Sequence, residues 1–338
     1  MPNRVVRYGV ISTAGIVLNN HIPAARESTN SEIAAISSRK ASKARMVADQ
    51  YDIPIWHESY DELLNDSNID AVINALPNSM HCKWTIKAAE AGKHILCEKP
   101  LAVTVEEARR MIDSAKANNV MLTEAFTHRW NPHLRTARRL ISEGAIGSPT
   151  SLQSFIAFSV KEPRGNIRFS PELGGGSLMD GGCYAVSACR FVLDEDPVRA
   201  SAFTYDSGKY GIDTTFNGLL EFPVGGVAHI RSSMDEPRSI MLMAVGTKGQ
   251  IEIPDMFDES GSVILKTDDE EWAEAIPGRN RFRVQLDEFS NCILSGKAPE
   301  FPPEDGLANT AALAALLSAA RTGTVVDVDQ TDGYRANP

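Results

Sequence analysis

Two stretches of the chain carry residue types that can move a proton or stabilise an anion. The first is CEKPLA, residues 97–102, in which Lys99 follows an apolar run and stands directly before a proline. The second is GGGSLMDGGCY, residues 174–184, in which Asp180 and Tyr184 are four residues apart. On a helix this spacing places two side chains on one face. The three consecutive glycines let the backbone approach a ligand closely.

A tyrosine becomes a useful base only when its surroundings lower its pKa. A free phenol titrates near pH ~10, which is too high for proton removal at neutrality. A neighbouring cation favours the phenolate and lowers that pKa, and either Lys99 or a positively charged ring of a bound ligand could supply the charge. Taken alone, however, Tyr184 also fits a packed aromatic side chain, and Lys99 also fits a surface turn. The elements that would position these residues therefore have to be considered.

The segment GVISTAGIVLNN lies where the first apolar run turns into the first helix. In dinucleotide-binding folds this turn usually reads G-x-G-x-x-G, so that backbone N–H groups can approach a pyrophosphate. Here Ser12, Ala14 and Val17 occupy the three glycine places, and Gly9 and Gly15 are out of phase. Small side chains still permit close approach, so the turn is compatible with a dinucleotide. An ordinary strand–helix turn would look the same.

The second apolar run ends in Ser37-Ser38-Arg39-Lys40. An NAD-preferring site usually places Asp or Glu here, to accept hydrogen bonds from the ribose 2′-hydroxyl. Hydroxyls and an arginine fork instead suit a 2′-phosphate. If a dinucleotide binds, these residues favour NADP over NAD, and the alternative is a solvated basic loop.

Short apolar runs alternate with amphipathic stretches over about the first 125 residues. The runs are not strictly alternating, as expected for parallel strands covered on both faces. They occupy residues 5–11, 32–37, 70–76, 94–99 and 120–126. Capping boxes that begin at Ser59 and Thr104 mark two helix starts between them. The alternation predicts an α/β domain in residues 1–125, with a doubly wound parallel sheet of Rossmann type.

The pattern changes after residue 125. Strand-like runs separated by Gly, Pro and Asp turns follow one another between residues 151 and 255, mostly without a clear helix between them. They predict a second domain of α+β class in residues 126–338, with a large, mostly antiparallel open sheet. An Ala/Leu-rich helix is expected at about residues 305–322, and it is expected to pack back on one of the domains, with the first domain as one option.

Composition limits the class of protein. The 338 residues suffice for two domains, and 43% hydrophobic with 23% charged residues is ordinary for a globular protein. A formal net charge of -10 argues against nucleic acid as a partner. No apolar run approaches the roughly 20 residues that cross a bilayer. The five cysteines form no CxxC pair, and the N-terminus has no signal-peptide core, so we expect a cytoplasmic protein.

Four motifs occur in one order along the chain. They are ALPNSMH, AGKHILCEKPLA, EAFTHRWNPH and GGGSLMDGGCY. Together they resemble the Gfo/Idh/MocA oxidoreductase family over nearly the whole chain. Within that family the motif sequences are most similar to those of NADP-dependent sugar dehydrogenases of the D-xylose type and of dihydrodiol dehydrogenases. It is also similar to keto-sugar reductases of deoxysugar pathways.

The resemblance implies roles for individual residues. Lys99 would point into the cleft beside the nicotinamide, after a Lys99–Pro100 bond that is typically cis in the family. Tyr184 stands where the family has His or Tyr. The expected cofactor-binding residues are Ser12, Thr13, Ala14, Ile16, Ser38, Arg39, Lys43, Leu76, Pro77, Asn78, His81, Glu98, Lys99 and Arg168. The expected substrate contacts are Glu124, Arg129, Asn131, Asp180 and Tyr184. Arg168 could equally touch the substrate or be a surface cation.

These roles give a hypothesis for the reaction. Tyr184 removes the proton of a substrate hydroxyl, Lys99 stabilises the developing alkoxide, and Asp180 orients a second hydroxyl. The cofactor, expected to be NADP, takes up the hydride. Oxidation of a sugar or polyol, with aldose C1 oxidised to a lactone, is favoured. The reverse reaction on a nucleotide-linked keto-sugar is an alternative, as is a non-catalytic cofactor-sensing regulatory protein.

Two further expectations concern metals and partners. Glu124, His128 and His133 have a loose ligand-like spacing, but HExxH and CxxC are both missing, so no metal is expected. Relatives of this family usually bury the open sheet against a partner subunit. A homodimer or homotetramer is therefore expected, and the sequence does not decide between them.

Overall fold

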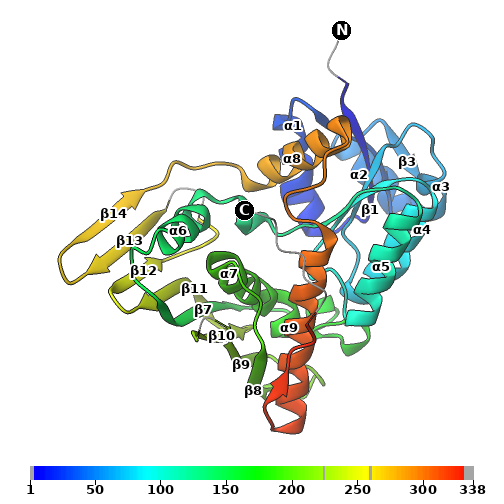
Figure 1. Cartoon of the computed structure of the whole chain (residues 1–338). Coiled ribbons are helices and arrows are strands. Elements are labelled where there is room, and N and C mark those ends of the chain that lie inside the picture. Colours follow the sequence, from blue (N-terminus) through cyan, green and yellow to red (C-terminus); the bar gives the residue numbers. More distant parts are fainter. Residues whose placement is uncertain (1–3, 224, 259–260, 331–338) are drawn as a thin grey trace. The chain divides into compact units, whose positions relative to one another are not determined.

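The computed structural model describes residues 4–223, 225–258 and 261–330 (Figure 1). The chain divides into two compact units. The described residues up to Ala125, together with Asn280–Leu307, form unit 1. Residues Phe126–Arg279, together with the described residues from Ala308 onward, form unit 2.

Unit 1 is built on a sheet of six parallel strands in the order β3-β2-β1-β4-β5-β6. The strands are β1 (Val6–Ile11), β2 (Ser31–Ser37), β3 (Ile55–His57), β4 (Ala71–Asn74), β5 (His94–Cys97) and β6 (Leu122–Glu124). This is the strand order of a doubly wound dinucleotide-binding sheet, and the order reverses between β1 and β4. The predicted parallel sheet is confirmed, and β3 is a short strand that the sequence pattern did not indicate.

Helices cover both faces of this sheet, as the fully buried strands require. They are α1 (Ile22–Glu27), α2 (Ala41–Gln50), α3 (Tyr60–Leu64), α4 (His81–Glu90), α5 (Val105–Ala117) and α8 (Arg281–Ser295). Apolar side chains of α1, α2 and α8 form the core on one face, and those of α3, α4 and α5 form it on the other. The Ser59 and Thr104 hydroxyls accept hydrogen bonds from the Glu62 and Glu107 N–H groups, so both predicted helix starts are confirmed.

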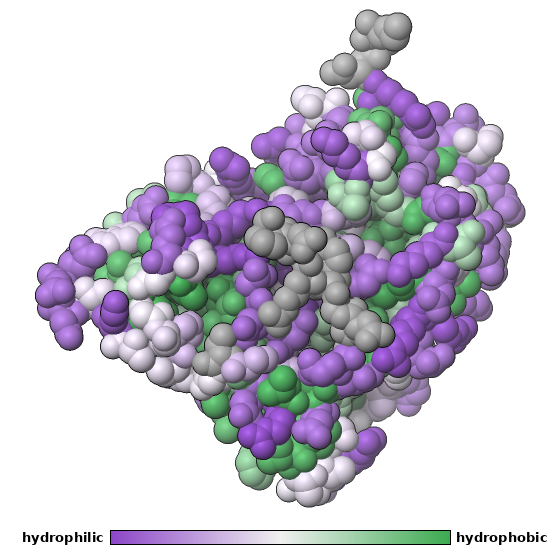
Figure 2. All heavy atoms as spheres, viewed as in Figure 1, coloured by the Kyte–Doolittle hydropathy of each residue, from purple (hydrophilic) through white to green (hydrophobic). Residues whose placement is uncertain are grey.

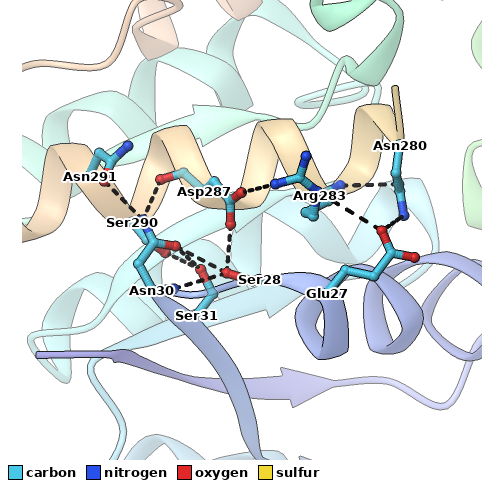
Figure 3. Close-up of polar contacts among 9 residues, drawn as sticks. All are labelled: Glu27, Ser28, Asn30, Ser31, Asn280, Arg283, Asp287, Ser290 and Asn291. Atoms are coloured by element: carbon cyan, nitrogen blue, oxygen red, sulfur yellow. Dashed lines mark hydrogen bonds and ion pairs between the residues drawn. The ribbon is translucent and has the colours of Figure 1, made fainter. Parts of the chain in front are cut away.

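Helix α8 returns to unit 1 from the far end of the chain and packs beside α1 (Figures 1 and 3). The Ser31 and Ser290 hydroxyls lie 2.7 Å apart, and the Asn30 amide donates to the Asp287 carbonyl at 3.0 Å. Placing residues 280–307 in the second domain was therefore wrong. These contacts join residues about 260 positions apart, and no local sequence pattern reports them.

Unit 2 is built on a sheet of nine strands in the order β14-β13-β12-β11-β7-β10-β9-β8-β15. The strands are β7 (Pro149–Ser159), β8 (Arg199–Tyr205), β9 (Thr215–Glu221), β10 (Val227–Ser233), β11 (Asp235–Gly246), β12 (Gly249–Ile253), β13 (Ser262–Thr267), β14 (Glu271–Ala275) and β15 (Val326–Asp327). Strands β7 and β10 pair in parallel, and the other neighbours pair antiparallel. The expected mostly antiparallel sheet is confirmed.

Helices α6 (Pro132–Ser142) and α7 (Cys183–Leu193) accompany this sheet, and α7 packs against β7, β10 and β11. Short helical turns, η3 (Thr127–Trp130), η4 (Ile167–Phe169), η5 (Pro171–Leu173) and η6 (Leu178–Gly182), lie in the loops. Helix α9 (Pro303–Thr322) crosses the division of the chain, which falls after Leu307. The Asn309 amide donates to the Cys183 carbonyl, so the expected packing on the first domain holds only for the start of α9.

The other face of this sheet carries exposed apolar side chains. Phe203 is 81% exposed, and Leu219 and Val227 are exposed on neighbouring strands at positions that alternate with buried residues. Figure 2 shows apolar surface gathered over the part of unit 2 where Figure 1 labels β8 and α9. Among the described residues, no helix has both the length and the apolarity needed to span a membrane.

Candidate active site

The carboxyl ends of neighbouring parallel strands bring most of the predicted cofactor residues to one edge of unit 1. Ser12, Thr13 and Ala14 follow β1, and Ser38 and Arg39 follow β2. Leu76, Pro77 and Asn78 follow β4, and Glu98 and Lys99 follow β5. In doubly wound sheets, ligands bind outside this edge, where the strand order reverses. The topology therefore puts these residues where a dinucleotide would bind.

The turn after β1 is built from small and polar residues. The Ser12 hydroxyl accepts a hydrogen bond from the Ala14 N–H at 3.0 Å, and the Thr13 and Ser38 hydroxyls lie 3.2 Å apart. Gly15 is open to added atoms, whereas Gly9 is a packing residue inside β1 whose added Cβ would meet Leu63 at 2.6 Å. The turn is therefore made of small residues, whereas Gly9 is required by packing inside unit 1.

The residues expected to contact the 2′-phosphate differ in their exposure to solvent. Ser38 is buried, with its hydroxyl against Thr13, while Arg39 and Lys43 are exposed near the start of α2. Ile16 is half-buried at the end of the turn. The three residues directly after β2 are Ser38, Arg39 and Lys40, and none of them is a carboxylate. This arrangement fits a phosphate better than a ribose hydroxyl.

The loop after β5 is fixed by buried polar groups. The Lys99–Pro100 peptide bond is cis, as the resemblance implied. The Glu98 N–H donates to the Asn74 carbonyl at 2.9 Å, and the Glu98 carboxylate lies 2.7 Å from Nε2 of His21. Beyond the cis bond, the Leu101 N–H donates to Oε1 of Glu124 at 2.7 Å. The segment on both sides of Lys99 is therefore held to the rest of unit 1.

Glu98 keeps its negative charge although it is buried. Burial by itself would raise the pKa of this carboxyl. The hydrogen bond from His21 and the electrostatic influence of His21, Lys99 and His81 together outweigh burial and hold the pKa below its usual range. The Glu98 carboxylate is therefore an anion that directly precedes Lys99 in the sequence and interacts with its charge.

His81 connects the loop after β4 to the loop after β5. Its ring nitrogens lie 2.9 Å from the Pro100 carbonyl oxygen and 2.8 Å from the Leu76 carbonyl oxygen, and the side chain is fully buried. Burial lowers the pKa of His81, against the opposing influence of the two carbonyls. Because both nitrogens face backbone oxygens inside unit 1, His81 holds the loops in place, and the expected direct cofactor contact is not supported.

In unit 2, three aromatic rings surround Tyr184 and meet it edge-on. The centroids of Phe126, His128 and Phe257 lie 5.2, 5.1 and 4.9 Å from the centroid of Tyr184, with interplanar angles of 70, 77 and 85°. We call these three residues the ring cluster. Edge-to-face geometry is the favourable arrangement of aromatic pairs, so the plane of the phenol is well determined.

Two residues that were expected to touch substrate instead support the ring cluster. Arg129 is almost fully buried, and its Nε donates to the Ser187 hydroxyl at 2.9 Å, which lies 3.1 Å from Nε2 of His128. Asn131 is fully buried, and its amide donates to the Met256 carbonyl at 2.7 Å, next to Phe257. The expected direct substrate contacts of Arg129 and Asn131 are therefore not supported.

Asp180 and Arg168 form an ion pair. Nε of Arg168 lies 2.6 Å from Oδ2 of Asp180, and the carboxylate raises the pKa of the guanidinium further above its usual range. Tyr184 is close enough to Arg168 to act on it electrostatically in the same direction. A cation of unit 2 itself therefore lies near the phenol, whereas the sequence alone pointed only to Lys99 or a bound ring as the source of such a charge.

The glycine run is needed because two other segments pass close to it. A Cβ on Gly175 would lie 2.4 Å from the Arg168 carbonyl oxygen. Gly176 has a φ of 120°, and its Cβ would lie 2.4 Å from Oδ1 of Asp213. The run thus brings the Arg168 segment against the start of the helix that carries Asp180.

Asp213 fixes the start of that helix. One of its carboxylate oxygens accepts hydrogen bonds from the Ser177 hydroxyl and the Leu178 N–H, both at 2.7 Å. Burial raises the pKa of Asp213, although these hydrogen bonds oppose the change. Sequence reasoning missed Asp213, as well as His21 and Phe257. Each is a single residue outside the four motifs, and its position relative to them is visible only in the fold.

The residues considered for a metal are engaged elsewhere. Glu124 accepts from Leu101, His128 lies against Ser187, and Nε2 of His133 accepts from the Gly261 N–H at 2.9 Å. Within the described part of the chain, no group of three or more His, Cys, Asp and Glu side chains could hold a metal ion.

The strand order and the residues at the carboxyl edge define a protein of the Rossmann dinucleotide-binding class. The particular family follows from comparison with known proteins. Residues 6–126 match the family model described as "Oxidoreductase family, NAD-binding Rossmann fold", and residues 134–252 match the GFO/IDH/MocA C-terminal domain. The chain belongs to the Gfo/Idh/MocA oxidoreductase family, which confirms the resemblance of the four motifs.

Relatives match along most of the chain. D-xylose 1-dehydrogenase (NADP(+)) 2 of Haloferax volcanii is 34% identical over 326 residues, which cover 95% of this chain and 99% of that protein. Trans-1,2-dihydrobenzene-1,2-diol dehydrogenase of Xenopus tropicalis is 31% identical over 261 residues, or 76% of each chain.

Solved structures agree with these similarities. The aldose-aldose oxidoreductase from Caulobacter crescentus, complexed with glycerol, has a TM-score of 0.89 at 29% identity and covers 96% of this chain and 100% of its own. A 3-ketoreductase from Actinomadura kijaniata, in complex with NADP and TDP-benzene, has a TM-score of 0.87 at 27% identity and covers 94% and 98%.

Proposed function

We propose that this protein is an NADP-dependent oxidoreductase that oxidises a hydroxyl of a sugar or polyol, with oxidation of an aldose at C1 to a lactone favoured. One observation carries the proposal. The chain is similar over nearly its whole length to an NADP-dependent D-xylose 1-dehydrogenase, and it carries the side chains for this chemistry. Lys99 lies in the loop after β5, before a cis bond to Pro100. Tyr184 is packed among aromatic rings, and Asp180, one helical turn before it, is paired with Arg168.

The residues of the carboxyl edge would hold the cofactor. Ser12, Thr13 and Ala14 suit the pyrophosphate, and Ser38 and Arg39 suit the 2′-phosphate. When bound, NADP supplies a ring that accepts hydride.

The side chains supply proton transfer and charge. Tyr184 takes the proton from the substrate hydroxyl, and the nearby Arg168 cation favours the phenolate that this requires. Lys99 stabilises negative charge on the hydroxyl oxygen as the proton leaves. Asp180, held by Arg168, accepts a hydrogen bond from a second hydroxyl and orients the reacting carbon.

The reverse reaction on a nucleotide-linked keto-sugar is the second candidate. Relatives include a dTDP-3,4-didehydro-2,6-dideoxy-alpha-D-glucose 3-reductase of Actinomadura kijaniata, 28% identical over 323 residues. The same side chains would serve that reaction, with Tyr184 returning the proton.

A substrate panel separates these candidates. D-xylose and other free aldoses, trans-dihydrodiols and dTDP-sugars would each be assayed with NADP(H) and with NAD(H). We expect turnover of free aldoses with NADP and at most weak turnover with NAD. Activity confined to dTDP-sugars would favour the reductase, and a strong preference for NAD would overturn the assignment of Ser38 and Arg39. Inactivity on the whole panel would favour a cofactor-sensing regulatory protein.

Assembly and location are proposed on separate grounds. The exposed Phe203, Leu219 and Val227 on the open face of the unit 2 sheet support a homodimer or homotetramer that buries this face. All five cysteines are free, which supports a location in the cytoplasm. Sedimentation or light scattering of the wild type and of Phe203→Asp would test the assembly, because the aspartate should favour monomers.

A further inference from the structure

A buried histidine–carboxylate pair in unit 1 has no part in the chemistry described so far. His21 lies at the end of the turn η1 (Val17–His21), which follows the dinucleotide turn. Its Nε2 lies 2.7 Å from Oε1 of Glu98, and the two side chains are only 2% and 9% exposed. Glu98 directly precedes Lys99, so the pair joins the start of the first helix to the loop that carries the proposed catalytic lysine.

The position of the His21 ring is set by packing and by this one hydrogen bond. Phe282 of α8 meets the ring edge-on, with centroids 5.4 Å apart and an interplanar angle of 86°. Nδ1 is buried and makes no hydrogen bond within the described residues. Nε2 is therefore the ring atom that donates to the carboxylate, and it is the atom whose loss should matter.

Glu98 is in turn fixed at both its backbone and its side chain. Its N–H donates to the Asn74 carbonyl, and its carboxylate is held by His21. The titratable groups that act on this carboxylate are His21 from η1, Lys99 from its own loop and His81 from α4. Burial is the largest single influence on Glu98 and favours the neutral acid, and without His21 only Lys99 and His81 would oppose it.

We propose that His21 is a positioning residue for the reaction: by holding the Glu98 carboxylate through Nε2, it sets the backbone and the negative charge beside Lys99. The inference rests on the proposed function, since it assumes that Lys99 acts on the substrate. A small displacement of a catalytic group can cost about 10²-fold in rate, which gives such a support a measurable effect.

Substitutions of His21 by amides separate positioning from packing. The amide nitrogen of glutamine reaches as far along the side chain as Nε2, whereas that of asparagine reaches only as far as Nδ1. We expect His21→Asn and His21→Phe to lower kcat by roughly 10- to 100-fold, with KM and the Kd for NADPH within about threefold of wild type. His21→Gln should restore most of kcat.

A second histidine–carboxylate pair in the same unit provides the control. Nε2 of His57 lies 3.1 Å from Oδ2 of Asp66, and neither residue belongs to the proposed site. His57→Asn should leave kcat unchanged. If His21→Asn and His21→Phe keep wild-type kcat, or if His21→Gln is no better than His21→Asn, the positioning role is overturned.

The cofactor-free protein gives a readout that does not depend on activity. The lowered pKa of Glu98 contributes stability above the pKa of an unfolded glutamate, about 4.3, and this stability is lost as the pH falls through the lower folded pKa. In His21→Phe the folded pKa rises, so unfolding by acid should begin at a higher pH than in wild type and in His21→Gln. If acid unfolding of His21→Phe begins at the same pH as that of the wild type, the proposed stabilisation of the Glu98 carboxylate by His21 is overturned.

The two proposals fail in different ways. If the wild type turns over none of the substrate panel, the proposed function is wrong, and the acid-unfolding series still decides whether His21 holds Glu98. If the wild type is active and the His21 variants match it, the positioning role alone is wrong.

Discussion

Lys99 and Tyr184 are held by two different kinds of surroundings. Around Lys99 in unit 1, the backbone is fixed by buried polar groups: Glu98 meets His21, and Leu101 donates to Glu124. Around Tyr184 in unit 2, the ring cluster fixes the plane of the phenol by packing.

The difference follows from what each residue needs. Lys99 has a long flexible side chain on a loop that leaves a strand, so its root must be fixed by directional hydrogen bonds. Tyr184 is on a helix with a fixed backbone, and only its ring needs orientation, which edge-on rings provide without using polar groups. The polar support is thus expected to be more sensitive to single changes than the aromatic one, because a buried group left without its partner is costly.

The largest expected effect comes from removing the two supported groups themselves. Lys99→Met and Tyr184→Phe should each lower kcat by about 10²- to 10⁴-fold, because one loses the ammonium and the other the proton acceptor. The Kd for NADPH, measured by fluorescence titration, should change only a few-fold. Lys87→Met, which removes a surface lysine paired with Asp61, is the control. Near-normal turnover in both Lys99→Met and Tyr184→Phe would show that neither side chain is catalytic, and the comparison of their two surroundings would then say nothing about catalysis.

The polar support is tested next through Glu124. Glu124→Leu leaves the buried Leu101 N–H without this acceptor and should lower the free energy of unfolding by about 1–3 kcal/mol, with a clear loss of kcat. Glu124→Gln keeps an oxygen acceptor and should lie close to wild type in stability. Urea unfolding and initial rates check both variants. Equal stability of the two variants would show that the hydrogen bond does not fix the loop.

The aromatic support should give a smaller effect. Phe257→Leu removes one ring of the cluster and should cost about 0.5–1.5 kcal/mol in stability and lower kcat by a few-fold. Phe191→Leu, a buried aromatic on α7 outside the cluster, should cost similar stability with no change in kcat. A larger loss of kcat in Phe257→Leu than in Glu124→Leu would reverse the expected order of the two supports.

The smallest effect concerns the start of the helix that carries Asp180. Burial raises the pKa of Asp213, so its stabilising contribution is complete below the unfolded value, about 3.9, and is lost as the pH rises through the higher folded value. Asp213→Asn has no titrating group, and its amide oxygen can still accept from Ser177 and Leu178. Between about pH 4 and pH 7, the wild type should therefore lose more unfolding free energy than Asp213→Asn. An equal change in both proteins would contradict the assigned pKa direction.

Sequence patterns were most informative where chemistry and structure are local. The capping boxes at Ser59 and Thr104, the parallel strands and the cis bond after Lys99 were all expected and are present. Each depends on residues within a few positions of one another or on a motif that a family shares. Ser12, Thr13 and Ala14 follow β1 as expected, and their contact with a cofactor stays a prediction.

Long-range contacts could not be predicted. The pairing of His21 with Glu98 joins residues 77 positions apart, and Asp213 reaches Ser177 from 36 positions away. Arg129 and Asn131 were expected to face the substrate because the family resemblance implied that their segment contacts it. Their burial is possible because Ser187 and Met256, far along the chain, accept their hydrogen bonds.

The return of α8 has a consequence for how the protein is made. The part of the unit 1 sheet that α8 covers stays uncovered until the ribosome has passed residue 295, after strands β7 to β14 of the unit 2 sheet have been synthesised. Domains of nascent chains usually fold from the N-terminus onward. Here α8 completes part of the unit 1 core only late in synthesis, so a fragment that stops at Ala125 should expose the apolar side chains that α8 covers and should aggregate.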